Sequence, residues 1–239
     1  MARMTIQIGQ ISSVSQGGPV SKLLENQLTA AERFNVPSFR LSVLKQLGLP
    51  EPNRENRQAD EIFDTLRSVP AKSADLINVQ VSAYSRDEAI KALKSSFQSF
   101  EAEHRKMYDP TVTRMRADLK WVTDKLVEAD REYQFAADSL RAAAEHNGKA
   151  ESRDVLLNST AATLNQQIVD LNRKKADLED TLAPLRTYPS QIFGELYAPE
   201  RPTTPSTFAL ILLGVLGGLA VGLAGVMLTH SLRQESAWS

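Results

Sequence analysis

The sequence predicts an α+β protein: a small mixed domain close to a membrane, a long antiparallel helical hairpin and one C-terminal transmembrane helix. Short alternating segments that lie far apart in the chain predict strands. Two heptad-patterned stretches of about 35 residues each flank a single Asn147-Gly148 turn. A further stretch, from Ser206 to Thr229, carries no charged residue and is long enough to span a bilayer.

The composition narrows the classes of function. The 239 residues carry a formal net charge of -1 and include no cysteine. A chain this close to neutral lacks the basic footprint of a general nucleic-acid binder. The absence of cysteine removes disulfides, thiolate zinc sites and thiol catalysis.

Strand patterns occur at three separated places in the chain, and each alternates apolar with polar residues. The apolar residues are Met4, Ile6 and Ile8 in the first, Ile77, Val79 and Val81 in the second, and Ile192 and Leu196 in the third. The heptad stretches lie between the second and third patterns. We therefore expect the helical hairpin to leave the domain and return, and the distant strands to meet near the membrane.

Three short amphipathic segments separate the first two strands. They are marked by Leu23, Leu24 and Leu28, by residues 38–49 with Ser38 as N-cap and Gly48 as stop, and by Ala59, Ile62, Phe63 and Leu66.

A longer helix follows the second strand. Ser85 and Glu88 have the spacing of a capping box, which predicts the start of this helix. Its apolar stripe consists of Ile90, Leu93, Phe97, Phe100, His104 and Met107. The Asp109-Pro110 step predicts either the end of this helix or a kink with a new helix start.

Two heptad seams come next, one from Val112 to Ala143 and one from Leu157 to Leu182. We expect these seams to pack against each other, with the central contacts made by Leu119, Val122, Leu126, Leu164, Ile168 and Leu171. The alternative is two helices folded onto a globular core. Alanines at positions 129, 136 and 143 favour the close helix–helix contact of a hairpin.

The membrane segment has two regular features. Gly214, Gly218 and Gly222 recur every four residues, which predicts a face for close packing against another helix. Before the segment, prolines recur every three residues at Pro199, Pro202 and Pro205. In a polyproline II rod the three rings lie on one side, so we expect them to position the domain above the membrane. The alternatives are a simple proline-rich linker and the ordinary glycine content of membrane helices.

Patterns of enzyme chemistry are missing. The sequence has no phosphate-binding glycine loop, no nucleophile elbow and no H-E-x-x-H. The histidines, His104, His146 and His230, are too scattered for a metal cluster. The carboxylates alternate with Lys and Arg, as expected on solvated helix faces. We predict a protein that is not an enzyme and that uses no cofactor or metal. An enzyme would require acidic side chains of several protomers to converge.

Taken in order, these features resemble the polysaccharide co-polymerase family, the Wzz-type chain-length determinants of bacterial O-antigen, capsule and exopolysaccharide. The resemblance is carried by "MTIQIGQI", by "NVQVSAYSRDEAIKAL", by the helical hairpin and by the prolines and glycines of the last segment. It covers essentially the whole chain and rests on the order of the features.

The sequence departs from the family pattern in three respects. The resemblance begins at the strand that, in the family, follows a first transmembrane helix, and it does not include that helix. Ser206 stands where a basic residue often follows the last proline, and Arg201 precedes Pro202. The tyrosine-kinase domain that some relatives carry is also lacking.

The resemblance implies a non-catalytic protein of the bacterial inner membrane with its soluble part in the periplasm. It implies a ring-like homo-oligomer that works with a polysaccharide polymerase or exporter, meets the growing glycan and sets its length. Two alternatives stay open: the inner-membrane adaptor of a polysaccharide exporter, and a tail-anchored coiled-coil protein that tethers partners to a membrane.

The predicted organisation has five parts. They are an α+β part over 1–108, a helical arm over 109–185, the last strand and prolines over 186–205, a transmembrane helix over 206–230 and a short tail over 231–239.

Overall fold

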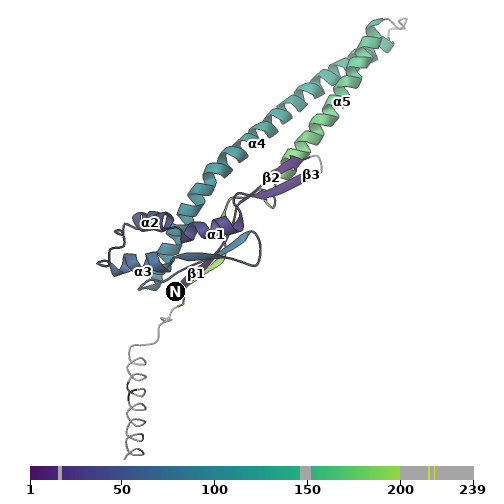
Figure 1. The fold of residues 1–239 in the computed structure, drawn as a ribbon. Coiled ribbons are helices and arrows are strands. Elements are labelled where there is room, and N and C mark those ends of the chain that lie inside the picture. Colours follow the sequence, from purple (N-terminus) through teal and green to yellow (C-terminus); the bar gives the residue numbers. More distant parts are fainter. Residues whose placement is uncertain (16–17, 146–151, 200–214, 216–217, 219–239) are drawn as a thin grey trace, which may run out of the picture. The chain divides into compact units, whose positions relative to one another are not determined.

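The computed structural model describes residues 1–15, 18–145, 152–199, 215 and 218 (Figure 1). The chain divides into two compact units, Ala2–Ala198 on one side and Met1 with Pro199–Ser239 on the other. The first unit contains a β-sheet and a helix of 60 residues, so the predicted mixed α+β class is confirmed. The predicted parts 1–108 and 109–185 both belong to this one unit.

Four antiparallel strands form the main sheet, in the spatial order β4-β5-β1-β6. Their bounds are β4 Arg67–Pro70, β5 Leu76–Val81, β1 Ala2–Gln7 and β6 Gln191–Tyr197. Strand β1 pairs with β5 on one side and with β6 on the other, so the three predicted strands do meet. Strand β4 was not predicted, because four residues ending in a proline carry too little alternation.

One face of this sheet forms the core. The alternating apolar residues of β1 and β5 are buried and pack into one cluster with residues of the helices. They are Ala2, Met4, Ile6 and Ile8 from the first strand segment and Ile77, Val79 and Val81 from the second. The polar residues between them, such as Arg3 and Asn78, lie exposed on the other face. The period-2 pattern thus selected the buried face correctly.

A second, two-stranded sheet corrects one prediction. Residues 10–23, part of which we expected in an amphipathic segment with Leu23 and Leu24, form the hairpin of β2 (Gln10–Ser15) and β3 (Gly18–Leu23). Helix α1 begins only at Gln27, after an Asn26 side chain that accepts from the Leu28 amide. Polar and apolar residues do not alternate in β2 and β3, so the pattern gave no sign of the hairpin.

Three short helices cover part of the core: α1 (Gln27–Asn35), α2 (Pro37–Gln46) and α3 (Arg57–Thr65). The predicted Ser38 cap is wrong, because Pro37 takes the first helical position and Val36 precedes it without a side-chain cap. The predicted stop at Gly48 is confirmed by its φ of +72°, which favours glycine.

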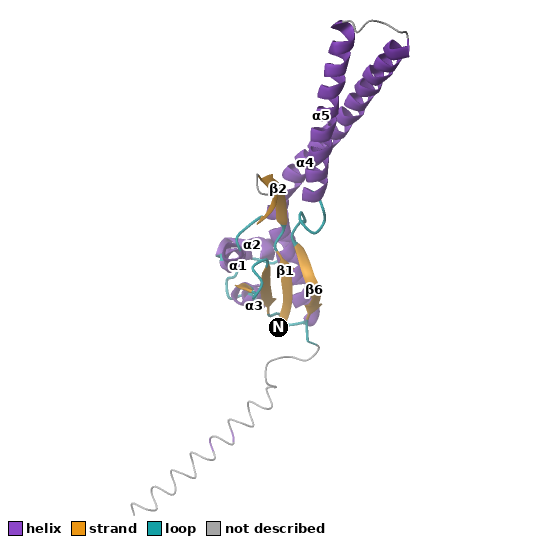
Figure 2. Ribbon diagram, turned by 90° about the vertical axis from the view of Figure 1, so that its right-hand side faces the viewer, coloured by secondary structure: helices purple, strands orange, loops and turns teal. Residues whose placement is uncertain are grey.

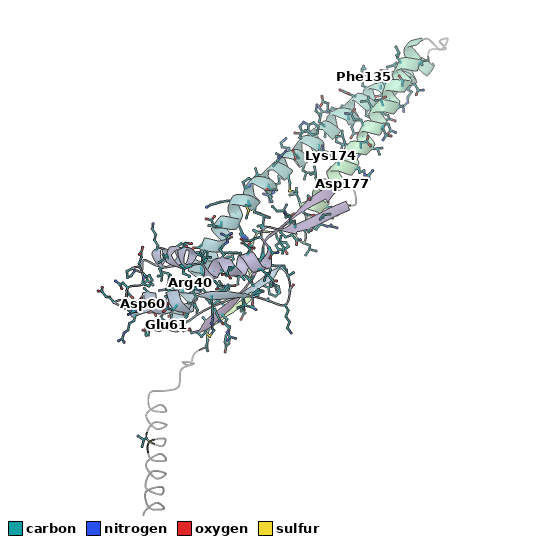
Figure 3. The ribbon with its side chains drawn as sticks, in the orientation of Figure 1. Arg40, Asp60, Glu61, Phe135, Lys174 and Asp177 are labelled. Atoms are coloured by element: carbon teal, nitrogen blue, oxygen red, sulfur yellow. The ribbon has the colours of Figure 1, made fainter. Side chains whose placement is uncertain are left out.

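Arg40 of α2 joins all three short helices (Figure 3). Its Nε donates to the carbonyl of Phe34 in α1 and its Nη1 to the carbonyl of Phe63 in α3, both at 3.1 Å. The guanidinium also lies 5.8 Å from the centroid of the Phe63 ring. These carbonyls belong to helix C-termini, which lack intrahelical partners, so Arg40 satisfies them.

Helix α4 (Arg86–Glu145) is longer than the pattern predicted. The capping box at its start is confirmed: the Glu88 amide donates to Ser85 Oγ, and the Ser85 amide donates to Glu88 Oε2. The predicted boundary at Asp109 is wrong, because Pro110 lies inside the helix. An interior proline costs about 3 kcal/mol, and burial of Phe100 and His104 before it and of Val112 after it favours continuation.

Helix α5 (Ser152–Thr181) packs along the distal part of α4 as the returning arm of a hairpin (Figure 2). The Nζ atom of Lys174 lies 5.4 Å from the ring centroid of Trp121, which sets the register of the two helices. The same register brings the two predicted heptad seams opposite each other. Phe135, near the far end, is 75% exposed (Figure 3).

The two ends of the first unit lie next to each other, at the end of the sheet where β1 begins and β6 ends. Arg3 pairs with Tyr197, and Arg86, the first residue of α4, donates from Nε to the Ala198 carbonyl at 3.1 Å. From this end of the sheet, α4 extends for 60 residues, or about 90 Å. The distal ends of α4 and α5 therefore lie far from the place where both ends of the first unit emerge (Figure 1).

Candidate functional site: the His104 network and the adjoining cleft

The hairpin residues predicted from the heptads lie along the contact between α4 and α5. Val122 and Leu164 are buried. The others are half-buried: Leu119, Leu126, Ile168 and Leu171. The stripe of the proximal half of α4 is buried at Leu93, Phe100 and His104, but Met107 is 45% exposed, contrary to prediction. Met107 lies just before the point where α5 begins to cover the helix.

Most predicted residues of the membrane segment lie outside the described residues: Pro202, Pro205, Gly214 and Gly222. Pro199 is half-buried in an irregular segment. Gly218 is helical, and a Cβ added to it would meet no described atom within 4 Å. Within the described ranges no helix has the length and apolarity needed to cross a bilayer, and the predicted span over 206–230 falls almost wholly outside them.

The His104 side chain is 1% exposed and makes hydrogen bonds to two segments that are distant in sequence. Its Nδ1 lies 2.6 Å from Ser190 Oγ and its Nε2 lies 3.1 Å from Glu25 Oε2. The Phe100 ring packs on the imidazole with a centroid separation of 4.1 Å. Glu25 also pairs with Arg33, whose Nη2 lies 2.6 Å from Glu25 Oε1.

The groups at the two ends of this hydrogen-bonded series, the Gly9 amide and the Glu25 carboxylate, have fixed roles as donor and acceptor. The Gly9 amide donates to Ser190 Oγ at 2.8 Å. The Glu25 carboxylate can only accept, so the His104 Nε2 atom carries hydrogen and donates to it. His104 Nδ1 and Ser190 Oγ form the remaining hydrogen bond. One continuous series of hydrogen bonds links the Gly9 amide, Ser190, His104 and Glu25.

Two opposing effects act on the Glu25 carboxyl. Burial by itself raises the pKa of Glu25, but the hydrogen bonds from His104 and Arg33, with the positive charge of Arg33, together hold that pKa below its usual value. Glu25 is therefore ionised at neutral pH. The hydrogen bond to Glu25 raises the pKa of Arg33 in turn.

The network fastens segments that are far apart in sequence. Ser190 comes directly before β6, at the end of the return from the arm, while His104 belongs to the outgoing helix α4. Gly9 lies between β1 and β2, and a Cβ on it would fall 2.7 Å from the Ser190 backbone nitrogen, so only glycine fits. Outgoing arm, returning arm and sheet thus meet at one buried point.

A cleft of about 600 Å³ adjoins the network on its Glu25 side. Its walls come from α1, α2 and α4, and Glu25 and Arg33 belong to both the network and the cleft. The helices that line it are held together by Arg40 and by the Phe34–Phe39 contact, with ring centroids 4.8 Å apart. A volume of this size is in the range of small-ligand sites.

The Ser190, His104 and Glu25 series has the residue types of an acyl-transfer triad, but its geometry suits a structural role. Ser190 is 2% exposed, and its oxygen already accepts from the Gly9 amide and is hydrogen-bonded to His104 Nδ1. A substrate cannot reach this oxygen in the described structure. The network is therefore suited to holding the base of the helical arm in place, and the adjoining cleft is suited to binding a small ligand.

Sequence reasoning missed Glu25, Arg33 and Ser190. The sign that was present was His104, a polar residue inside an otherwise apolar helix stripe. Such a residue requires a buried partner, but the partners come from segments 79 and 86 residues away and no local pattern identifies them.

Comparison with known proteins adds no family assignment. No family model matches the chain, and a search of curated proteins finds no match.

Proposed function

We propose that this chain is a non-catalytic, membrane-anchored regulator of surface-polysaccharide chain length or assembly, of the polysaccharide co-polymerase type. In this proposal it works in the bacterial inner membrane with the hairpin in the periplasm. It assembles as a ring of identical chains beside a polymerase or exporter. The Wzz resemblance supports the proposal through the order of elements rather than through any single motif.

The observation that carries the proposal is the placement of the hairpin relative to the ends of the first unit. Strands β1 and β6 are neighbours in the sheet, and both ends of the first unit lie beside the Arg3–Tyr197 pair. Helix α4 starts at the same end of the sheet and extends about 90 Å from it. A unit anchored at that end of the sheet would project a long arm away from its anchor. Such an arm could contact a growing polymer, as the proposed function requires.

The buried network also supports a mechanical role. His104 and Ser190 bind the outgoing and returning arms to each other at the base of the hairpin. Thr187 adds a second tie there, because its Oγ1 accepts from the Ser12 amide and donates to the Thr181 carbonyl. An arm anchored at its base by buried hydrogen bonds keeps its direction relative to the sheet.

The test is a glycan length profile. The gene is deleted in its host, and surface glycans are separated by gel electrophoresis with and without the complementing gene. We expect deletion to replace a modal length by a broad distribution and complementation to restore the mode. An unchanged length distribution in the deletion strain would refute the proposal.

The two alternatives predict different results in the same strains. An exporter adaptor predicts loss of surface glycan with intracellular accumulation. A tail-anchored tether predicts no glycan change, and an epitope tag beside Gly148 that protease digests only after the membrane is lysed. For the proposed regulator, intact spheroplasts should lose the tag.

A further inference from the structure

The cleft beside the His104 network has a lining with a definite chemical character. Glu32 and Arg33 come from α1, Phe39 from α2 and Glu103 from α4. Thr29 and Ser38 add hydroxyl groups. The walls thus offer donors, acceptors and an aromatic ring within one cavity of about 600 Å³.

Several of these polar groups have hydrogen-bond donors or acceptors that are available to a ligand. From the residues that the structure describes, the Glu32 carboxylate accepts one long hydrogen bond, 3.4 Å from Asn35 Nδ2. Arg33 uses Nε and Nη2 for Glu25, and its Nη1 makes no hydrogen bond to any residue that the structure describes. The same holds, over the described ranges, for the hydroxyls of Thr29 and Ser38. Acceptors and donors are therefore both available in the cleft.

The charges of the lining decide against an anionic ligand. Among the lining residues that the structure describes, Glu25, Glu32 and Glu103 carry carboxylates and Arg33 carries a guanidinium. Outside the lining, Lys106 pairs with Glu103, with Nζ 2.6 Å from Oε1, so three carboxylates face two basic groups. Arg33 is already paired with Glu25. A further carboxylate or phosphate entering the cleft would meet net negative potential. A simple cation offers no acceptor for Arg33 Nη1, whereas a ligand with hydroxyl groups offers both donors and acceptors.

We propose that this cleft binds an uncharged pyranose segment of the glycan. This inference rests on the proposed function and specifies the class of ligand that the cleft would bind. Each sugar hydroxyl both donates and accepts, which matches the mixture of carboxylate, guanidinium and hydroxyl groups on the walls. The C–H face of a pyranose packs on an aromatic ring, which Phe39 supplies. The cleft is large enough for a short segment of the polymer.

The hydrogen-bonded network connects the cleft to the base of the helical arm. Glu25 lines the cleft and accepts from His104, and His104 is bonded to Ser190 at the return from α5. Glu25 and Arg33 are thereby held in place before the sugar binds. Preorganised groups lose little freedom on binding, which favours affinity for a polar ligand.

The test measures binding to the full-length chain in lipid nanodiscs by saturation-transfer NMR and calorimetry. The probes are uncharged hexasaccharides of glucose, mannose, galactose and rhamnose, with hexagalacturonate as the anionic probe of equal length. We expect at least one uncharged probe to bind and hexagalacturonate not to bind. The double variant Glu32→Ala, Glu103→Ala should weaken that binding by about tenfold or more.

The matched control is Glu51→Ala, Glu61→Ala, which removes the same charge from residues outside the cleft lining. It should bind as the wild type does, and circular dichroism should show both double variants folded. Failure of every uncharged probe, preference for hexagalacturonate, or equal binding by the cleft variant would overturn the inference. A normal effect of the wild-type gene on glycan length alongside any of these results would leave the proposed function standing and refute the cleft alone.

Discussion

Ser190 satisfies two buried groups at once. Its oxygen accepts from the Gly9 amide, and its hydroxyl forms a hydrogen bond with His104 Nδ1. We expect Ser190→Ala to destabilise the first unit by about 2 kcal/mol or more, because each buried group left without a partner costs about 1–3 kcal/mol. The measurement is chemical denaturation followed by circular dichroism.

The matched control for this variant is Ser159→Ala on α5. Ser159 is exposed, and its hydroxyl donates to the Leu156 carbonyl of its own helix. Its loss should change the free energy of unfolding by less than about 0.5 kcal/mol. Equal effects of the two substitutions would contradict the assigned network.

Glu25 gives the network a defined pH dependence. Its pKa is lower in the folded chain than the ordinary value of 4.5, so the unfolded chain takes up the proton first as the pH falls. The stabilisation is fully present above about pH 4.5 and is lost as the pH falls through the folded pKa. We expect Glu25→Gln to be less stable than wild type at pH 7 and the difference to shrink towards pH 3.

The measurement for Glu25→Gln is the free energy of unfolding at a series of pH values from 7 to 3. Glu101→Gln serves as the control, because Glu101 makes an exposed pair with Arg105 in the adjoining turn of α4. Exposed pairs contribute little. A Glu25→Gln difference that stays constant with pH would show that the carboxylate charge plays no part.

At the scale of elements, the hairpin depends on two seams kept in register. The Lys174–Trp121 contact places residues 126–132 of α4 opposite residues 163–169 of α5. Deleting both segments removes one heptad from each arm and preserves both seams, so we expect a stable hairpin shorter by about 10 Å. On the proposed function, the modal glycan length should shift in the same strain.

A matched deletion tests whether the seam, rather than arm length, is responsible. Removing 126–130 and 163–167 shortens both arms by a similar amount but turns each seam by about 140°. This variant should melt at a markedly lower temperature in circular dichroism than the heptad deletion. Similar melting of the two variants would argue against a seam-dependent hairpin.

At the scale of the whole molecule, strands from distant parts of the chain pair side by side. Thr5 Oγ1 lies 3.0 Å from Asn78 Oδ1 across β1 and β5, although the residues are 73 positions apart. The chain has no cysteine, so Thr5→Cys, Asn78→Cys creates one thiol pair. We expect this pair to oxidise, because directly opposed Cβ atoms need only a small movement to reach disulfide distance.

The compartment of oxidation adds a second result. In a Gram-negative host, the pair should form a disulfide without added oxidant, since the proposed location is the oxidising periplasm. Non-reducing electrophoresis after thiol trapping detects it. A control with Thr5→Cys and Ser159→Cys should stay reduced within the chain. Failure of the first pair to oxidise even in purified protein would contradict the strand register.

The sequence by itself determined the elements whose residues repeat locally. Alternation identified β1, β5 and β6 and the buried face of the first two, and the heptads identified both arms, because burial of one face imposes a period on the side chains. The capping box located the start of α4 within one residue. The same local reasoning placed a boundary at Pro110 that tertiary packing overrode.

Only the tertiary structure decided where the chain's polar groups meet. The β2–β3 hairpin and β4 have no clear period, so their pairing partners rather than their own residues make them strands. The cleft and the His104 network unite Glu25, His104 and Ser190, whose positions in sequence carry no common signal. Hydrogen bonds need atoms within about 3 Å of each other, and the fold alone brings residues so far apart in the chain to that distance.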